Sequence, residues 1–217
     1  LLRVPGDEGR SLWITGSEAG ADALTIDYSE PFHLDGGLHF DGGQAGYDRL
    51  TVVGNGSTRV ENRADRVEEG QLDLREAGKR LSVSWTGLEP APRLEQVGQV
   101  TNSGLLSYGN SPEILNVADF SQGPEATLEI EIGGTTPGPG TPLDDGYDQV
   151  NVTGEAALDG ELKITLINDF VPTAGQTFDI VTFGSVSGAF ERTDGPFAFG
   201  GSNDLFFDLV QQADRLQ

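Results

Sequence analysis

The chain has 217 residues, and its 35 acidic and 13 basic residues give a formal net charge of −22 at pH 7. Such an acidic surface repels nucleic-acid phosphates and anionic lipid head groups, which excludes nucleic-acid binding and attachment to anionic membranes as main roles. Cysteine is absent, which excludes disulfide frameworks and zinc–thiolate sites, and no apolar run approaches the ~20 residues that a membrane-inserted helix needs.

Apolar and polar residues alternate along most of the chain, a pattern typical of β-strands with one buried face. In residues 126–134, Leu128, Ile130 and Ile132 point one way, and the glutamates between them point the other. The predicted strands, in chain order, are residues 11–16, 23–29, 37–42, 49–54, 80–87, 126–134, 149–154, 161–168 and 177–184. Most of them end on Gly, Asn or Asp, which supply the positive φ that corners need.

Two intervening segments depart from this pattern. Residues 63–81 are highly charged, but Gly70 and Gly78 interrupt any helix, and two further strands around a turn are predicted there. Residues 133–146 are rich in proline and glycine, and we expect them to form a surface loop that projects from the scaffold.

The chain divides into two halves with different sequence character. The segment 87–100 is the expected junction, so the first unit is an N-terminal β-repeat segment at residues 1–92. The second unit, residues 93–217, ends in a tail at 208–217 that is either a strand or a frayed end. The chain starts without methionine, and we interpret it as a processed or partial piece of a longer chain.

One phrase occurs three times, as "GADALTI" at residues 20–26, "GYDRLTV" at 46–52 and "GYDQVNV" at 146–152. The strand spacing fits two architectures, an antiparallel β-sandwich and a β-helix with about 20–25 residues per coil. The repeated corner favours the β-helix, because each coil meets the same stereochemical demand at the same place. The predicted fold is therefore all-β, a right-handed parallel β-helix (β-solenoid), with the antiparallel sandwich as the alternative.

A single continuous interior should collect the inward-facing residues of the second half. Val181 is the least secure of them, because it breaks the alternation with Ile180. The predicted core residues are Leu128, Ile130, Ile132, Val150, Val152, Leu162, Ile164, Leu166, Ile180 and Val181.

Carboxylates at corners are the candidate metal ligands. Asp22, Asp48 and Asp148 each follow a glycine by two residues, which resembles a calcium-binding roll, but the copies are not consecutive and an ion between coils needs oxygens from both. Asp144 and Asp145 pair in the proline- and glycine-rich segment. For Asp22, Asp48 and Asp148 we favour the alternative that each caps a turn through its own backbone, and we expect no cofactor and no ion that the fold requires.

Aromatic residues concentrate near the C-terminal end of the chain. A stacked β-structure leaves apolar edges open at its last coil, so a cap or a second copy has to cover them. Phe197, Phe199, Phe206 and Phe207 are predicted to lie in that cap or in a contact between copies.

Four stretches carry a resemblance to a known class of proteins: "GLLSYGNSPEILNV" (104–117), "TLEIEIGG" (127–134), "YDQVNVTGEAALDGELKITL" (147–166) and "PTAGQTFDIVTFGSVSGAF" (172–190). Residues 98–191 resemble β-helical repeats of bacterial autotransporter passenger domains and related repeats in giant exported proteins of planctomycete-type bacteria. The first half is similar to a companion repeat with a "GNDTLT-like" corner. Tyr108 and Glu113 depart from that family, which has proline and glycine there.

The resemblance implies a β-solenoid located at the bacterial cell surface or outside the cell. No catalytic constellation is present, so we expect a non-enzymatic structural module of an exported assembly that associates with copies of itself through its ends. The alternative is an adhesin or carbohydrate-binding module whose partner is an extracellular polysaccharide, bound through the 133–146 segment.

Overall fold

The computed structural model describes residues 10–17, 19–44, 46–109, 112–141, 144–195 and 206–217. Strands make up 53% of the chain, and the described residues contain no helix. It follows that none of them forms a helix long and apolar enough to cross a membrane. The prediction of an all-β chain is confirmed.

The strands form three open sheets. The eleven-stranded sheet contains, in spatial order, β1 (Leu12–Thr15), β3 (Leu38–Asp41), β7 (Lys79–Thr86), β6 (Glu69–Glu76), β5 (Arg59–Asn62), β9 (Gln99–Asn102), β12 (Asp119–Gln122), β16 (Gln149–Leu158), β18 (Val181–Gly188) and β20 (Arg215–Leu216), with β11 (Ile114–Val117) also beside β16. The six-stranded sheet contains β14 (Gly138–Thr141), β15 (Asp144–Tyr147), β13 (Thr127–Ile132), β17 (Glu161–Leu166) and β19 (Arg192–Asp194), with β10 (Leu105–Leu106) beside β13. The three-stranded sheet contains β2 (Ala23–Asp27), β4 (Arg49–Val53) and β8 (Arg93–Glu95).

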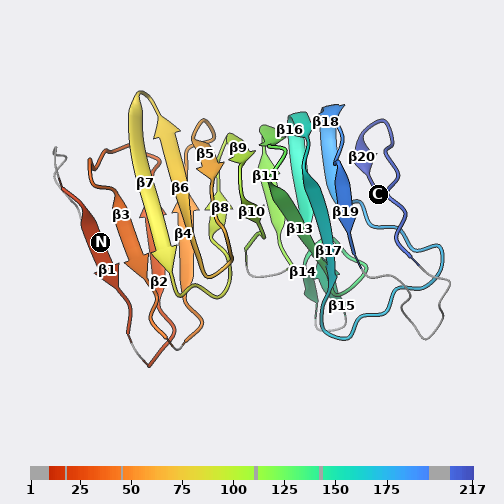
Figure 1. Ribbon diagram of the computed structural model, residues 1–217, viewed down its shortest axis with the longest axis horizontal. Helices are drawn as coiled ribbons and strands as arrows, with labels where there is room; N and C mark the ends of the chain where they lie inside the picture. Colours follow the sequence, from red (N-terminus) through yellow and green to blue (C-terminus); the bar gives the residue numbers. More distant parts are fainter. Residues whose placement is uncertain (1–9, 18, 45, 110–111, 142–143, 196–205) are drawn as a thin grey trace.

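The sheets are mixed, but most neighbours run in the same direction. Among the described residues, 12 of the 17 strand pairings are parallel. Parallel partners lie from 20 residues apart, as for Gln99 and Asp119, to 45 residues apart, as for Leu38 and Val83. The chain therefore leaves a sheet and returns beside its own earlier strand, and Figure 1 shows the strands following one another along the long axis of the molecule.

Among the described residues, two of the five antiparallel pairings are the hairpins β6–β7 and β14–β15. The charged segment 63–81 contains β6 and the start of β7, which pair antiparallel around a turn, as predicted. The segment 133–146 was expected to be a projecting loop, and this expectation is wrong: it contains β14 and most of β15, and β15 pairs with β13. Tyr147 provides the reason, because its buried side chain anchors β15 beside Ile132.

Strand boundaries differ from the sequence pattern in two places. β18 begins at Val181, four residues later than predicted, whereas β16 continues to Leu158. The length of β16 lets it pair with β11 along its first half and with β12 along its second half. The eleven-stranded sheet also includes strands from both sequence segments, and β8, which starts at Arg93, pairs with β4.

One hydrophobic core runs through strands from both halves. Nine of the ten core residues predicted for the second half are buried, and Leu166 is partly buried against the others. The prediction of a continuous interior is therefore confirmed. Val181 is fully buried even though it breaks the alternation, because Ile180 precedes the strand proper and faces inward as well.

A ladder of buried amide side chains links three neighbouring strands. Asn62, Asn102 and Gln122 occupy the same register position at the ends of β5, β9 and β12. Asn62 Nδ2 donates to Asn102 Oδ1 at 2.9 Å, and Asn102 Nδ2 donates to Gln122 Oε1 at 3.1 Å. The same amides donate to the carbonyls of Leu105 and Thr127, where the chain turns toward its next strand. The ladder thus satisfies buried backbone groups that the corner would otherwise leave unpaired.

Replacing Ile130 with alanine tests the core. Ile130 is 1% exposed, so the substitution should lower the free energy of unfolding by about 2–5 kcal/mol, because it removes buried contacts and leaves a cavity. Urea titration followed by circular dichroism measures this loss. Val171→Ala is the control, since Val171 is 51% exposed and should change stability by less than about 0.5 kcal/mol. Equal, small effects for both variants would mean that β13 does not face the core.

Replacing Asn102 with leucine tests the ladder. The variant keeps the volume but leaves Asn62, Gln122 and the Thr127 carbonyl without their partner, and we expect it to lose about 3 kcal/mol or more. The matched control is Asn116→Leu, because Asn116 is exposed on β11. Urea unfolding compares the two, and a loss no larger than that of the control would remove the ladder as a source of stability.

Candidate functional site

The repeated Gly-x-Asp corners join neighbouring strands. The first two copies stack directly, because β2 pairs in parallel with β4 and Ala23 lies opposite Arg49. Asp48 is 2% exposed, and its Oδ1 accepts the backbone N–H of Asp22 at 2.6 Å. The repeated phrase is therefore a corner of the scaffold, as predicted.

The third copy makes a similar connection with more donors. Asp148 is 2% exposed, and its two carboxylate oxygens accept the backbone N–H groups of Glu113 at 2.7 Å and Glu131 at 2.9 Å. These donors lie 35 and 17 residues earlier in the chain. The expectation that such aspartates cap their own turn is wrong for Asp48 and Asp148, because both bond to distant segments instead.

Burial controls the ionisation of Asp148. It raises the pKa of this carboxyl to about 7, although the N–H groups of Glu131 and Glu113 act in the opposite direction. The nearby Glu131 and Glu129 raise it further, and burial also raises the pKa of Glu131. Lys163 lies on the other side of Glu129, with its Nζ 2.8 Å from the carboxylate. Asp148 thus sits in an acidic, desolvated corner.

Asp144 has the opposite environment. Its carboxylate accepts the Thr135 hydroxyl at 2.6 Å and the Gly146 N–H at 2.9 Å, which ties the start of β15 to the segment that precedes β14. These hydrogen bonds lower its pKa to about 2. Asp145, the adjacent member of the predicted pair, is exposed.

The five candidate calcium ligands do not converge on one point. The described residues contain no group of three or more His, Asp or Glu side chains placed to hold a metal ion. Asp22, Asp48, Asp144 and Asp148 instead accept N–H or O–H donors of the protein. Asp22 is the most local case, because it accepts the N–H and the hydroxyl of Ser17 at 2.5 and 2.9 Å.

The C-terminal tail is docked against the last long strand. β20 pairs antiparallel with β18, and Leu216 is buried opposite Val181. Arg215 donates to Asp179 at 2.7 Å, and Gln217 donates to the other oxygen of that carboxylate at 2.9 Å. Of the tail at 208–217, only Arg215–Leu216 is therefore a strand, so the strand prediction is confirmed for these last residues alone.

The predicted C-terminal aromatic group is only partly described. Phe207 is half-buried and makes an edge-to-face contact with Phe178, with ring centroids 6.1 Å apart. Phe206 is 67% exposed. Phe197 and Phe199 lie outside the described residues.

Apolar residues are incompletely buried at the two ends of the molecule. Leu12 and Ile14 on β1 are half-buried, whereas their register partners on β3, Leu38 and Phe40, are 4% and 3% exposed. The partly buried hydrophobics that pack on the core are Leu12, Ile14, Leu24, Phe32, Leu166, Phe170, Val186, Phe190 and Phe207. All of them lie in residues 12–32, in residues 166–190 or at Phe207, and these parts lie toward the opposite ends of the long axis in Figure 1.

Exposed apolar side chains add to these end surfaces. Trp13 on the edge strand β1 is 72% exposed, and one face of its indole stacks on His39 with centroids 4.0 Å apart. At the other end, Phe206, Leu209 and Val210 are exposed. Trp13, Leu209 and Val210 could not be predicted from the sequence, because alternation alone does not show which of the described strands lies at the edge of its sheet.

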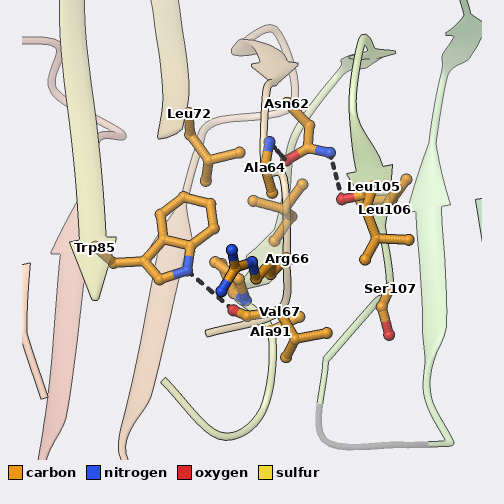
Figure 2. Close-up of a pocket in the computed structure, with 12 residues that line it drawn as sticks. Asn62, Ala64, Arg66, Val67, Leu72, Trp85, Ala91, Leu105, Leu106 and Ser107 are labelled. Carbon is orange, nitrogen blue, oxygen red and sulfur yellow. Dashed lines mark hydrogen bonds between the residues drawn. The ribbon is translucent and has the colours of Figure 1, made fainter. Parts of the chain in front are cut away.

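The interior next to Trp85 offers no room for a ligand. Figure 2 shows a cavity between Leu72, Trp85 and Leu106, and its volume is about 10 Å³. That is enough for one water at most. Trp85 Nε1 donates to the Val67 carbonyl at 3.1 Å, which fixes the ring at the cavity wall.

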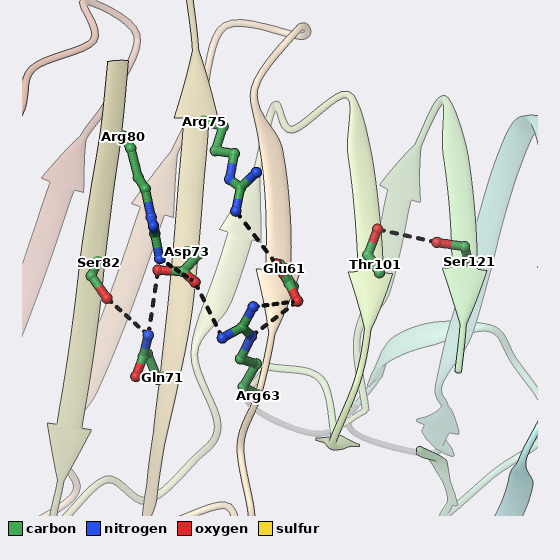
Figure 3. A network of polar contacts seen from close by, with 9 residues as sticks. All are labelled: Glu61, Arg63, Gln71, Asp73, Arg75, Arg80, Ser82, Thr101 and Ser121. Carbon is green, nitrogen blue, oxygen red and sulfur yellow. Dashed lines mark hydrogen bonds and ion pairs between the residues drawn. The ribbon is translucent and has the colours of Figure 1, made fainter. Parts of the chain in front are cut away.

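A network of charges covers the outer face of β5, β6 and β7 (Figure 3). Asp73 is fully buried beneath it, and Arg80 Nη2 donates to its carboxylate at 3.1 Å. Burial raises the pKa of Asp73, but hydrogen bonds from Ser82 and Arg80 outweigh it and the pKa is lowered. Next to Asp73, Arg63 donates through Nε and Nη2 to Glu61 at 2.9 and 2.7 Å.

Replacing Asp148 with asparagine tests its titration. The folded pKa of about 7 lies above the ordinary 3.8, so the stability that the protonated carboxyl contributes is complete below about pH 4 and is lost as the pH rises through about 7. The free energy of unfolding of the wild type should therefore fall over this range by on the order of 4 kcal/mol more than that of the variant. Urea unfolding at several pH values measures the difference.

Asp144→Asn is the matched control for that experiment. The pKa of Asp144 is lowered to about 2, so its contribution is present above about pH 4 and is lost only as the pH falls toward 2. This variant should keep the wild-type slope between about pH 4 and 7. If Asp148→Asn also keeps that slope, Asp148 is ionised in the folded protein throughout the range.

Comparison with protein-family models, curated proteins and solved structures finds no match to this chain. Its function is therefore inferred from the contacts, burial and charges of the described residues. Among these features, the apolar end surfaces are the ones whose side chains are not fully buried within the described fold.

Proposed function

We propose that this chain is a non-enzymatic structural module of an exported bacterial cell-surface or extracellular assembly, and that it associates with copies of itself through its two ends. The module is a right-handed parallel β-helix of the kind that the autotransporter-like sequence stretches suggest. Two observations support the β-helix: parallel partners predominate, and the chain repeatedly returns beside its own earlier strand.

The distribution of partly buried apolar residues carries the assembly proposal. Core residues between the two ends are buried, whereas Leu12, Ile14 and Leu24 at one end are only half-buried. An open sheet edge next to uncovered apolar side chains is a template for another strand. A second copy supplies both strand pairing and apolar contact. Contact between opposite ends would produce an open filament, and contact between like ends would produce a closed dimer.

The charge of the chain determines how specific that contact must be. A formal charge of −22 makes copies repel each other. Only a well-packed contact overcomes this repulsion, so association should strengthen when salt or divalent cations screen it. The screening length falls from ~30 Å at 0.01 M salt to ~8 Å at 0.15 M.

Internal polar groups support a scaffold role for the corners. The carboxylates of Asp48 and Asp148 accept backbone N–H groups of distant segments, and the Asn102 side chain forms hydrogen bonds within the amide ladder. Their side chains hold the strands in register. They are therefore occupied with the architecture of the module.

One observation favours a second candidate, a carbohydrate-binding module or adhesin. Trp13 presents an exposed indole whose orientation is fixed by stacking on His39, and such rings can pack against the apolar face of a sugar. In that case Trp13→Ser would abolish retention on a polysaccharide matrix and leave the sedimentation behaviour unchanged. Loss of self-association without any polysaccharide retention favours the assembly proposal.

Sedimentation velocity across salt concentrations tests the assembly proposal. We expect the sedimentation coefficient of the isolated chain to increase with protein concentration, and to do so more steeply at high salt. Trp13→Ser and Phe206→Ser each remove an exposed aromatic ring from one end, and each should weaken association by about tenfold or more, the effect of truncating an interface anchor.

The matched control is Tyr47→Ser. Tyr47 is 49% exposed but precedes β4, the central strand of its sheet, so it belongs to neither end. This variant should associate like the wild type. A monomer at every salt and protein concentration would overturn the proposal, and so would equal association of all three variants.

A further inference from the structure

Three arginines lie side by side on the outer face of the eleven-stranded sheet. Arg75 of β6 is the register partner of Arg59 on β5 and of Arg80 on β7. All three side chains are exposed. Like charges that face each other directly across strands destabilise a sheet, so this arginine row, Arg59–Arg75–Arg80, opposes the fold that presents it.

The carboxylates of the same face compensate the row only in part. Glu61 Oε1 accepts two nitrogens of Arg63, and Arg75 Nη2 lies 3.9 Å from the other oxygen of this carboxylate, Oε2. Arg80 makes a single hydrogen bond to Asp73. Figure 3 shows the Asp73 carboxylate between Arg80 and Arg63, and the Glu61 carboxylate next to Arg75 and Arg63. A guanidinium carries five N–H donors, so Arg75 and Arg80 keep donors for another acceptor.

Arg59 of the row and the neighbouring Lys79 have no carboxylate partner among the described residues. Within the part of the chain that the structure describes, Arg59 and Lys79 form no ion pair. Together with Arg75 and Arg80 they line a groove of about 520 Å³ beside the β6–β7 turn. Glu76 is the only carboxylate in its lining, so the groove carries a net charge of +3.

The rest of the molecule limits which anion can enter. Residues 59–80 contain six of the 13 basic residues and six acidic ones, so the remainder of the chain carries the whole net charge of −22. A long polyanion would extend from the groove into that field and be repelled. A compact anion stays within the groove, where contact with the cations is screened least.

We propose that this groove binds one compact divalent oxyanion, a sulfate or phosphate group, between the guanidinium groups of the arginine row and the Lys79 ammonium. Planar guanidinium groups match the oxygens of such anions in a two-point, charge-assisted arrangement. The bound anion replaces the repulsion within the row by attraction. The free inorganic ions and a phosphate monoester on a sugar offer this divalent charge, and a sulfate monoester offers the same oxygen arrangement with one negative charge.

Titration followed by NMR tests this site. Sodium sulfate or sodium phosphate should produce saturable shifts of the backbone amides of residues 57–59 and 75–80, and sodium chloride at equal ionic strength should not. Glucose 6-sulfate and glucose 6-phosphate form the second arm. Tighter binding of these monoesters would identify a modified sugar as the ligand, and equal or weaker binding would identify the inorganic ion.

The double variant Arg59→Gln/Arg75→Gln removes two members of the row. It should bind sulfate and phosphate at least about tenfold more weakly. In low salt without the anion it should melt at a higher temperature than the wild type, because the repulsion is gone. Arg192→Gln is the matched control: Arg192 is exposed on β19, and among the described residues its only ion pair is with the adjacent Glu191 at 3.8 Å.

Three results would overturn the proposal. The first is equal binding by the wild type and the double variant. The second is a response to chloride that matches the response to sulfate and phosphate. The third is a set of shifts that lie outside the groove. The low-salt melting curve shows whether the double variant is folded, so a loss of binding can be assigned to the site itself.

Discussion

Register between strands that lie 20 to 45 residues apart is the constraint on which this structure depends. Each strand is too short to bury its apolar face alone, and it does so only when the strand before and the strand after it present their apolar positions at the same level. Asn62, Asn102 and Gln122 enforce that level at one corner, because a slip of one residue would leave several buried amides unpaired. Asp48 and Asp148 do the same at other corners by accepting N–H groups of distant segments.

A stack of strands that pair in this way leaves an open sheet edge wherever the stack ends. Within the part of the chain that the structure describes, most strands of the eleven-stranded sheet pair along both edges, whereas β1 pairs along one edge only. The half-buried Leu12 and Ile14 show this at one end of the described chain. At the other end, β20 and Phe207 cover β18 and Phe178 in part. The proposed association through the ends follows from the same constraint that holds the interior together.

Acidic residues predominate over the chain as a whole, whereas basic residues gather on one face of the eleven-stranded sheet. Acidic side chains dominate the surface and oppose contact between copies, so any contact has to be specific. The outer face of β5, β6 and β7 is the exception, with cations opposite one another where alternating signs would be more stable. Functional sites are where a locally destabilising arrangement such as this arginine row is expected. The proposed oxyanion supplies the negative charge that the row lacks.

The sequence by itself determined the strands, the inward face of each strand and the role of the repeated corner. Alternation of apolar residues and the positions of Gly, Asn and Asp are local properties, so the buried Leu128, Ile130 and Ile132 and the hairpin within 63–81 could be predicted from them. Tertiary structure decided which residues meet across long separations: the amide ladder, the aspartates that bond to distant N–H groups, the docking of β15 at Tyr147 and the arginine row. It also decided that Trp13 is exposed while Phe207 is half-buried. The physical reason is that hydrogen-bond partners and burial depend on which strand lies alongside, and a pattern with period two is the same whichever neighbour a strand has.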